Sequence, residues 1–290
     1  MIPAHNEERV IGRLLSRLTT ATDPHSPDTP PNPDKADLDL IVVCNGCVDA
    51  TAEVAKRFPG VRVIETPEPS KRVALRLGDE AARGEFPRVY VDADVELGRG
   101  DVLALAAALA DPSVLACSPG RVIPRTGVSR AVRWYYDVWE QLPHVRRGIF
   151  GRGVIALSEA GYQRIAALPM LMSDDLAMSS AFDEEERRVV DTAQVLVHPP
   201  RTWADLVRRR ARAATGTTQA YAGPADLRTD SRTGKRDLID LVLRNPPLAV
   251  KMPVFLAVAV LARRHAARAV RRGDYSTWLR DDSSREAAQP

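Results

Sequence analysis

The chain contains few cysteines and carries little net charge. Among its 290 residues there are 3 cysteines, and 41 Lys+Arg stand against 38 Asp+Glu, which gives a formal charge of +3. An odd and low number of cysteines argues against a disulfide scaffold and for a reducing compartment. Cys44 and Cys47 form one C-x-x-C spacing without a second pair, so they are weak support for zinc or redox chemistry. The near-balanced charge gives no case for a nucleic-acid partner.

Long apolar runs are also missing. The opening MIPAHNEE turns polar at once and therefore does not read as a secretory signal peptide. The longest uncharged apolar run, residues 252–262, is too short to span a bilayer. It is either a core helix or an interfacial helix backed by the arginines after it, and in the second case residues 252–272 contact a membrane peripherally. We expect a cytoplasmic protein, either throughout the cytoplasm or at the inner face of the plasma membrane.

Short β-rich apolar segments alternate with helical patterns over the first 120 residues. We expect strands at 38–44, 61–65, 88–92 and 113–118, and helices at 7–18, 49–58, 71–83 and 101–110. This alternation predicts an α/β fold with a mostly parallel sheet flanked by helices. Residues 22–37 hold several prolines and almost nothing to bury, so they are predicted to form a disordered loop.

The pattern changes after about residue 120. Residues 129–142 gather two tryptophans and two tyrosines in a helix-like stretch, which is either core packing or a platform for an acceptor. Farther on we expect a strand at 189–200 and an arginine-rich helix at 202–219. The predicted organisation is a catalytic domain at 1–220, with a nucleotide-binding part at 1–120 and an acceptor part at 121–220. A helical C-terminal extension with a polar tail follows at 221–290.

Two carboxylates close the strand expected at 88–92. Asp92 and Asp94 lie one residue apart, and their oxygens suit Mg²⁺ or Mn²⁺ shared with substrate phosphates. Ligands of open α/β sheets bind at the carboxyl ends of the strands, where PAHNE and CNGCVD are also expected. Alone, the pair also fits a phosphatase of the haloacid dehalogenase type, whose first Asp is a nucleophile. That class expects its pair near the N-terminus and a Thr or Ser shortly after it. Here the pair comes after several strands and helices and is followed by Val95-Glu96-Leu97, so the phosphatase class ranks lower.

The order of the motifs is more specific than any one of them. The series PAHNEE, VVCNGCVDAT, SKRVALRLGDEAA, VYVDADVEL and SDDLAMS, followed by an arginine-rich helix, resembles the family 2 glycosyltransferases over about residues 1–220. The resemblance implies a GT-A, Rossmann-like fold and an inverting, metal-dependent hexosyltransferase. Such an enzyme moves sugar from a nucleotide-sugar donor to an acceptor, here a small or lipid-linked molecule. Synthesis of cell-envelope polysaccharide or glycolipid is the expected setting.

The resemblance also implies residue roles. Asp175 matches the general base and Asp174 its acidic neighbour, while Asp94 with His198 would hold Mn²⁺ or Mg²⁺. The residues matched to donor binding are Pro3, Ala4, Glu7, Asn45, Asp49, Lys71, Asp92, Arg210 and Arg212. Cys44 and Asn45 replace the family's usual Asp, so the nucleotide base stays open. Arg210 and Arg212 stand where the family has a Gln-x-x-Arg-Trp motif, which is not intact here.

Each assignment has a plainer structural alternative. Asp174 and Asp175 could merely cap a helix, and a single His such as His198 is more often structural than a ligand. Two other functions also fit part of the pattern. A nucleotidyltransferase would need a Gly-rich phosphate loop, which PAHNEERVIG lacks. A non-catalytic nucleotide-sugar binder would show donor affinity without turnover.

Overall fold

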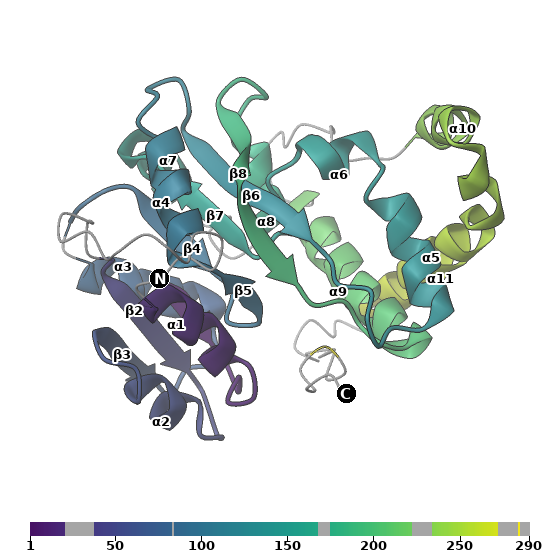
Figure 1. The fold of residues 1–290 in the computed structure, drawn as a ribbon. Helices are drawn as coiled ribbons and strands as arrows, with labels where there is room; N and C mark the ends of the chain where they lie inside the picture. The colour runs from purple at the N-terminus through teal and green to yellow at the C-terminus, as the bar shows by residue number, and fades with distance from the viewer. Residues whose placement is uncertain (21–37, 83, 168–174, 222–233, 272–283, 285–290) are drawn as a thin grey trace. The chain divides into compact units, whose positions relative to one another are not determined.

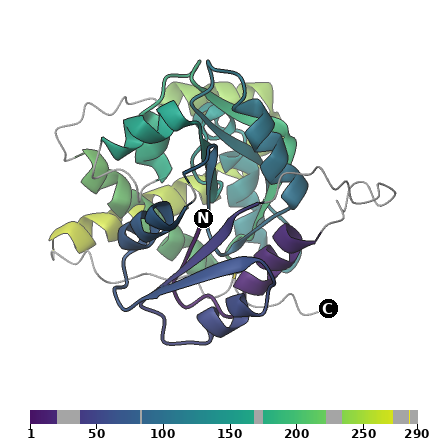
Figure 2. The same ribbon diagram turned by 90° about the vertical axis from the view of Figure 1, so that its left-hand side faces the viewer.

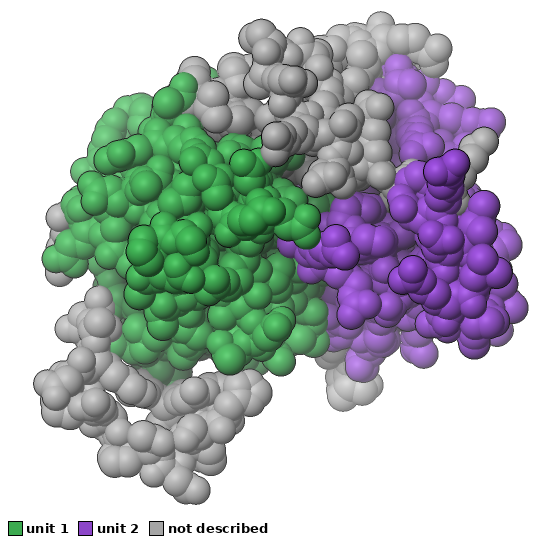
Figure 3. All heavy atoms as spheres, turned by 90° about the horizontal axis from the view of Figure 1, so that it is seen from above, with its two compact units in different colours: residues 1–122, 149–197 green, residues 123–148, 198–290 purple. Residues whose placement is uncertain are grey.

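The computed structural model describes residues 1–20, 38–82, 84–167, 175–221, 234–271 and 284 of the chain. The loop predicted at 22–37 lies outside the described residues. Figure 3 colours two compact units, Met1–Val122 with Ile149–Val197 and Ile123–Gly148 with His198–Pro290. These units do not follow the division at residue 220 expected from the sequence, since the arginine-rich helix groups with the C-terminal helices. Each unit is described below by itself.

The first unit is built on a parallel sheet flanked by helices (Figures 1 and 2). Its first three strands pair in parallel in the order β1-β2-β3: β1 (Ile2–Ala4), β2 (Leu40–Asn45) and β3 (Val61–Thr66). The Met1 amino group donates to the Val89 carbonyl (2.7 Å), and the Val91 N–H donates to the Met1 carbonyl (2.9 Å). In parallel strands, one residue bonds through its N–H and its carbonyl to the two residues that flank the residue opposite it. Met1 does so with Val89 and Val91, so β4 (Arg88–Val91) runs parallel beside β1.

The helices between these strands follow the predicted positions closely. They are α1 (Ile11–Thr19), α2 (Thr51–Lys56), α3 (Lys71–Ala81) and, after the next strand, α4 (Arg99–Ala108). Helix α1 buries Ile11, Leu14, Leu15 and Leu18, which recur at helical spacing and belong to the same hydrophobic core as the strand residues Ile2, Val42 and Val95. Ser70 starts α3 by accepting a hydrogen bond from the Val73 N–H (3.3 Å), an N-cap contact.

A second sheet continues from β4 in the order β4-β7-β6-β8-β5. Its further strands are β5 (Val95–Leu97), β6 (Ala116–Val122), β7 (Val154–Leu157) and β8 (Arg187–Val197). Strands β6 and β8 are parallel and the other pairs are antiparallel, so this sheet is mixed. Helices α7 (Glu159–Ala166) and α8 (Asp175–Ser180) lie in the chain between β7 and β8. The sequence pattern did not predict β5, which is three residues long.

The second unit is helical in the part that the structure describes. It contains α5 (Arg130–Trp139), α6 (Pro143–Arg147), α9 (Trp203–Tyr221), α10 (Lys235–Arg244), the 3₁₀ helix η1 (Pro246–Val250) and α11 (Met252–Arg271). Tyr135, Tyr136 and Trp139 are buried, and Phe255 of α11 stacks on Tyr135 with ring centroids 5.3 Å apart. The aromatic cluster of α5 is therefore core packing. No helix of the described residues is both long and apolar enough to cross a membrane.

Candidate active site

The polar motifs of the first unit gather at one edge of its parallel sheet. Parallel strands end on the same edge, so the residues that follow β1, β2 and β4 meet there. The segments PAHNE and NGCVD begin in the last residues of β1 and β2, and DAD directly follows β4, as the sequence predicted. The strands that end at this edge are anchored in the core. The residues that follow them are therefore held in place, and their side chains can face a ligand.

The loop after β1 and the turn after β2 are locked together. The Glu7 N–H donates to the Thr51 hydroxyl (2.8 Å), and the Glu8 N–H donates to Oδ2 of Asp49 (3.2 Å). In return, Oδ1 of Asn6 accepts from the Val48 N–H (2.8 Å), with Asn6 held at a left-handed φ of 54°. Such a conformation is uncommon outside glycine and is tolerated best by Asn and Asp. The two segments therefore form one rigid rim.

Several residues matched to donor binding also hold this rim together. Asp49 accepts hydrogen bonds from both the N–H and the hydroxyl of Thr51, at the start of α2. Asn45 is only 4% exposed, and its side-chain amide satisfies both of its polar atoms in one orientation, in which it donates to the Ala4 carbonyl (2.9 Å) and accepts from the Ser70 N–H (3.3 Å). Glu7 is buried in the same place, whereas Pro3 lies half-buried in β1. The structure thus brings the first five predicted donor residues together.

The C-x-x-C spacing belongs to this rim and forms no disulfide. All three cysteines are free thiols. The Cys47 thiol accepts from the Asn6 N–H (3.4 Å) and donates to the Ala4 carbonyl (3.4 Å). Burial raises the pKa of Cys44 to about 12, and burial likewise raises the pKa of Cys117 to about 12. The two buried thiols are therefore packed as small apolar groups.

Lys71 and Asp92 form an ion pair at the same edge. Nζ of Lys71, the first residue of α3, lies 2.7 Å from Oδ1 of Asp92, which follows β4. The side chains are 29% and 33% exposed, so a ligand from solvent can reach both. The sequence had assigned both residues to the donor, and the fold places them side by side across 21 positions of the chain.

Asp94 continues this edge beyond the buried Ala93. It is half-buried and directly precedes β5. Within the described ranges, no three His, Cys, Asp or Glu side chains are grouped closely enough to form a complete metal site. Mg²⁺ and Mn²⁺ bound with a diphosphate usually take only one or two carboxylates from the protein, so the Asp92/Asp94 pair fits an ion of that kind.

A glycine-rich loop before β7 supports Asp92, a role that the sequence pattern did not assign to it. The Asp92 N–H donates to the Gly153 carbonyl (2.7 Å), and Gly153 has a φ of +66°. A Cβ at this position would lie 2.6 Å from Cγ1 of Val95 and 3.4 Å from Oδ2 of Asp92. Only glycine fits here without a shift. The signal in the sequence is the short Gly151-Arg152-Gly153 stretch.

Arg152 belongs to the same loop and has a buried side chain. Its side chain is only 4% exposed, and Nη1 donates to the Pro119 carbonyl of β6 (3.2 Å). Burial lowers the pKa of Arg152 to about 10, while Asp191 acts in the opposite direction. The guanidinium remains charged at neutral pH, so the loop beside Asp92 keeps a buried positive charge.

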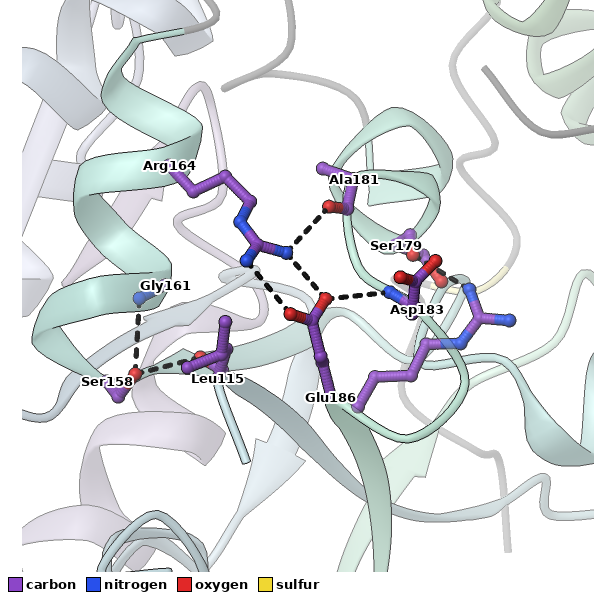
Figure 4. Close-up of polar contacts among 9 residues, drawn as sticks. Leu115, Ser158, Gly161, Arg164, Ser179, Ala181, Asp183 and Glu186 are labelled. Carbon is purple, nitrogen blue, oxygen red and sulfur yellow. Dashed lines mark hydrogen bonds and ion pairs between the residues drawn. The ribbon is translucent and has the colours of Figure 1, made fainter. Parts of the chain in front are cut away.

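Asp175 is the first residue of α8, as predicted for a helix start. Asp174 lies outside the described residues. Figure 4 shows how the chain after α8 is held: Arg164 of α7 donates to the Ala181 carbonyl (3.4 Å) and pairs with both carboxylate oxygens of Glu186 (2.5 and 2.9 Å). Arg187 donates to the Ser179 carbonyl (2.8 Å) at the end of α8. The sequence reading did not single out these arginines, because nothing local marks their partners.

The other predicted residues belong to the second unit. The His198 carbonyl accepts a hydrogen bond from Arg209 of α9 (2.8 Å). The Arg210 guanidinium lies over the rings of Trp139 (5.5 Å) and Tyr135 (6.0 Å), whereas Arg212 is exposed. The metal site of Asp94 with His198 and the diphosphate clamp of the two arginines stay predictions, since they draw on both units.

A comparison with protein families decides the class of the protein. The model of glycosyl transferase family 2 matches residues 1–157, more than half of the chain. The chain belongs to glycosyl transferase family 2. It is therefore a glycosyltransferase, and the prediction from the motif order is confirmed. The matched residues include the rim and the Asp92/Asp94 pair and end within β7.

Solved structures with a similar fold are GT-A glycosyltransferases, which confirms the predicted fold class. The mannosyltransferase PcManGT from Pyrobaculum calidifontis, solved with GDP-Man and Mn²⁺, superposes with a TM-score of 0.54 at 20% identity, covering 98% of this chain and 83% of that one. Glucosyl-3-phosphoglycerate synthase from Mycobacterium tuberculosis, solved with Mn²⁺, UDP and glucosyl-3-phosphoglycerate, gives 0.48 at 19% identity over 78% and 80% of the two chains. Among the curated proteins compared with it, none matches the chain.

Proposed function

We propose that this family 2 glycosyltransferase is metal-dependent and inverting, and moves a hexose from a nucleotide-diphosphate sugar to an acceptor hydroxyl. The observation that carries the proposal is the Lys71–Asp92 ion pair, two residues from Asp94, at the carboxyl edge of the parallel sheet. A cation beside two carboxylates suits a diphosphate with a divalent ion, because one carboxylate can bind the ion while the lysine binds phosphate oxygen.

Asp94 is the proposed metal ligand, with His198 as a second ligand and Asp92 nearer to the ribose or sugar. The ion, Mn²⁺ or Mg²⁺, supplies neutralisation of the negative charge that builds up on the departing diphosphate. Lys71, Arg210 and Arg212 add positive charge around the same group. The Pyrobaculum enzyme with a similar fold was solved with GDP-Man and Mn²⁺. This supports a divalent ion and a nucleotide-sugar donor without selecting the base or the sugar.

Asp175 is the proposed general base. Its carboxylate takes the proton from the acceptor hydroxyl while that oxygen bonds to the anomeric carbon and the bond from this carbon to the diphosphate oxygen breaks. One displacement without a protein nucleophile inverts the anomeric configuration. Arg164 and Arg187 donate hydrogen bonds at the far end of this six-residue helix, and a helix held at that end supports the role of its first residue, since a base must keep its position during attack. The acceptor is either a small molecule or lipid-linked.

The first experiment is a thermal-shift panel of nucleotide sugars with and without Mn²⁺ on the full chain. A donor that binds the folded state raises the melting temperature by mass action, and the correct donor should do so most strongly with Mn²⁺. The Asp94→Asn variant should lose the Mn²⁺-dependent part of this shift. Asp111→Asn is the matched control, because Asp111 pairs with Arg188 on the surface of the same unit.

The second experiment measures transfer or donor hydrolysis at saturating donor. Asp175→Asn should keep the donor-induced shift and lose turnover about 10²–10⁴-fold, the usual contribution of a general base. Full activity in this variant would refute the assignment of the base. Donor binding by the wild type without turnover on any acceptor would favour the non-catalytic binder, and release of pyrophosphate from a nucleoside triphosphate would favour the nucleotidyltransferase.

A further inference from the structure

Helix α11 turns apolar side chains outward. Leu256 and Val260, one turn apart, are 43% and 45% exposed, whereas Phe255, Val258 and Ala262 of the same helix are buried in the second unit. The helix has thus already buried one apolar side, against α9 and α5. A surface helix normally carries polar residues on the side opposite its buried stripe. The outward side of α11 does not follow this rule in its first half.

Arginines occupy the same side of α11 in its second half. At 100° per residue, Arg263 and Arg264 continue the line of Leu256 and Val260, and Arg268 lies at its margin one turn later. All three are exposed. No Asp or Glu occurs anywhere from residue 241 to 273 of the sequence. Ordinary solvated helices mix both signs of charge, so this surface combines exposed apolar area with charge of a single sign.

Helix α10 provides an internal comparison. Its exposed Ile239 and Leu243 are also one turn apart and are more exposed than the pair on α11. Asp237 and Asp240 lie on the same short helix, so its charges include both signs. Exposed apolar side chains alone therefore do not distinguish α11, whereas their combination with purely positive charge does.

We propose that the face of α11 formed by Leu256, Val260, Arg263, Arg264 and Arg268 binds the surface of an anionic lipid bilayer. The helix lies along the surface: its apolar first half enters the boundary between headgroups and acyl chains, and its arginines contact lipid phosphates. Charge complementarity selects this occupant, because the face offers several cations and no carboxylate to a partner. The inference uses only the second unit and is independent of the proposed catalytic roles.

The test is sedimentation of the full chain with sucrose-loaded vesicles in about 0.1 M salt. Vesicles of phosphatidylcholine alone are compared with vesicles in which roughly a third of the lipid is phosphatidylglycerol. The wild type should bind the anionic vesicles at least about tenfold better, and added salt should release it. Arg263→Gln/Arg264→Gln and Leu256→Ser/Val260→Ser should each weaken binding at least about tenfold.

Two matched variants separate this face from general stickiness and net charge. Arg146→Gln/Arg147→Gln removes the same charge from an exposed pair on α6 of the same unit, and Ile239→Ser/Leu243→Ser removes apolar side chains from α10. Both should bind like the wild type. The proposal is overturned if the wild type ignores anionic vesicles or if a control weakens binding as much as the α11 variants. It is also overturned if light scattering without lipid shows a dimer that Leu256→Ser/Val260→Ser dissociates, because a second copy would then cover the face.

Discussion

Replacing Gly153 by alanine tests how tightly the loop before β7 holds Asp92. At a φ of +66°, an L-residue costs about 1–2 kcal/mol relative to glycine. The new Cβ would lie 2.6 Å from Cγ1 of Val95, well inside van der Waals contact, so the loop or Val95 must move. Overpacking of this kind adds about 1–3 kcal/mol, which brings the expected loss of stability to about 2–5 kcal/mol.

Gly60 provides the matched control in the same unit. It also has a positive φ (+80°), but a Cβ there meets no atom within 4 Å. Gly60→Ala should therefore lose only the conformational part, about 1–2 kcal/mol. Thermal unfolding would measure the difference between the two variants as a melting temperature lower by roughly 2–4 °C for each kcal/mol. The donor-induced shift should fall in Gly153→Ala alone, because the displaced loop carries Asp92 with it.

A double variant isolates the clash itself. Val95→Ala removes the methyl group that the new Cβ would meet, so its cost and that of Gly153→Ala should not add. The stability loss of the combined variant is expected to be smaller than the sum of the two single losses by about 0.5–3 kcal/mol, the usual coupling between residues in contact. Equal losses for the two glycine variants, together with additive behaviour of the pair, would refute the reasoning.

Other measurements follow from burial and charge. The Arg164 guanidinium holds the pKa of Glu186 below its usual 4.5, so the stability from this pair is present above that pH and is lost as the pH falls through the lower folded-state value. The difference in melting temperature between wild type and Glu186→Gln should therefore be constant from about pH 8 to 6 and vanish at acidic pH. A difference that persists at acidic pH would contradict this linkage. At pH 8 an aromatic disulfide reagent should modify one thiol of the native protein quickly, namely Cys47, because burial raises the pKa of each of the other two cysteines to about 12. Cys47→Ser should abolish this fast phase, while unfolding should expose all the thiols. Leu14 is 0% exposed, so Leu14→Ala should lower the free energy of unfolding in urea by about 3–5 kcal/mol. Arg17→Ala removes a partly exposed ion pair and should lower it by less than about 1 kcal/mol.

The elements around the rim were predictable because their patterns are local. The helix expected at 71–83 is α3 (Lys71–Ala81), and the strand expected at 38–44 is β2 (Leu40–Asn45). Apolar residues at a spacing of two or of three to four positions identify such elements within a few turns of chain. Strand β5 escaped prediction because three residues carry no period, and its pairing with β8 joins segments about 100 positions apart.

The sequence by itself determined the family, the alternation of strands and helices, and the carboxylates that close β4. These depend on residue types and short spacings, which are present in the chain before it folds. Only the tertiary structure decided that Gly153 supports Asp92, that Asp49 and Asn45 hold the rim, and that α11 exposes Leu256 beside its arginines. Such contacts join residues brought together by strand pairing and helix packing, and no local spacing records which face of an element its neighbours will cover.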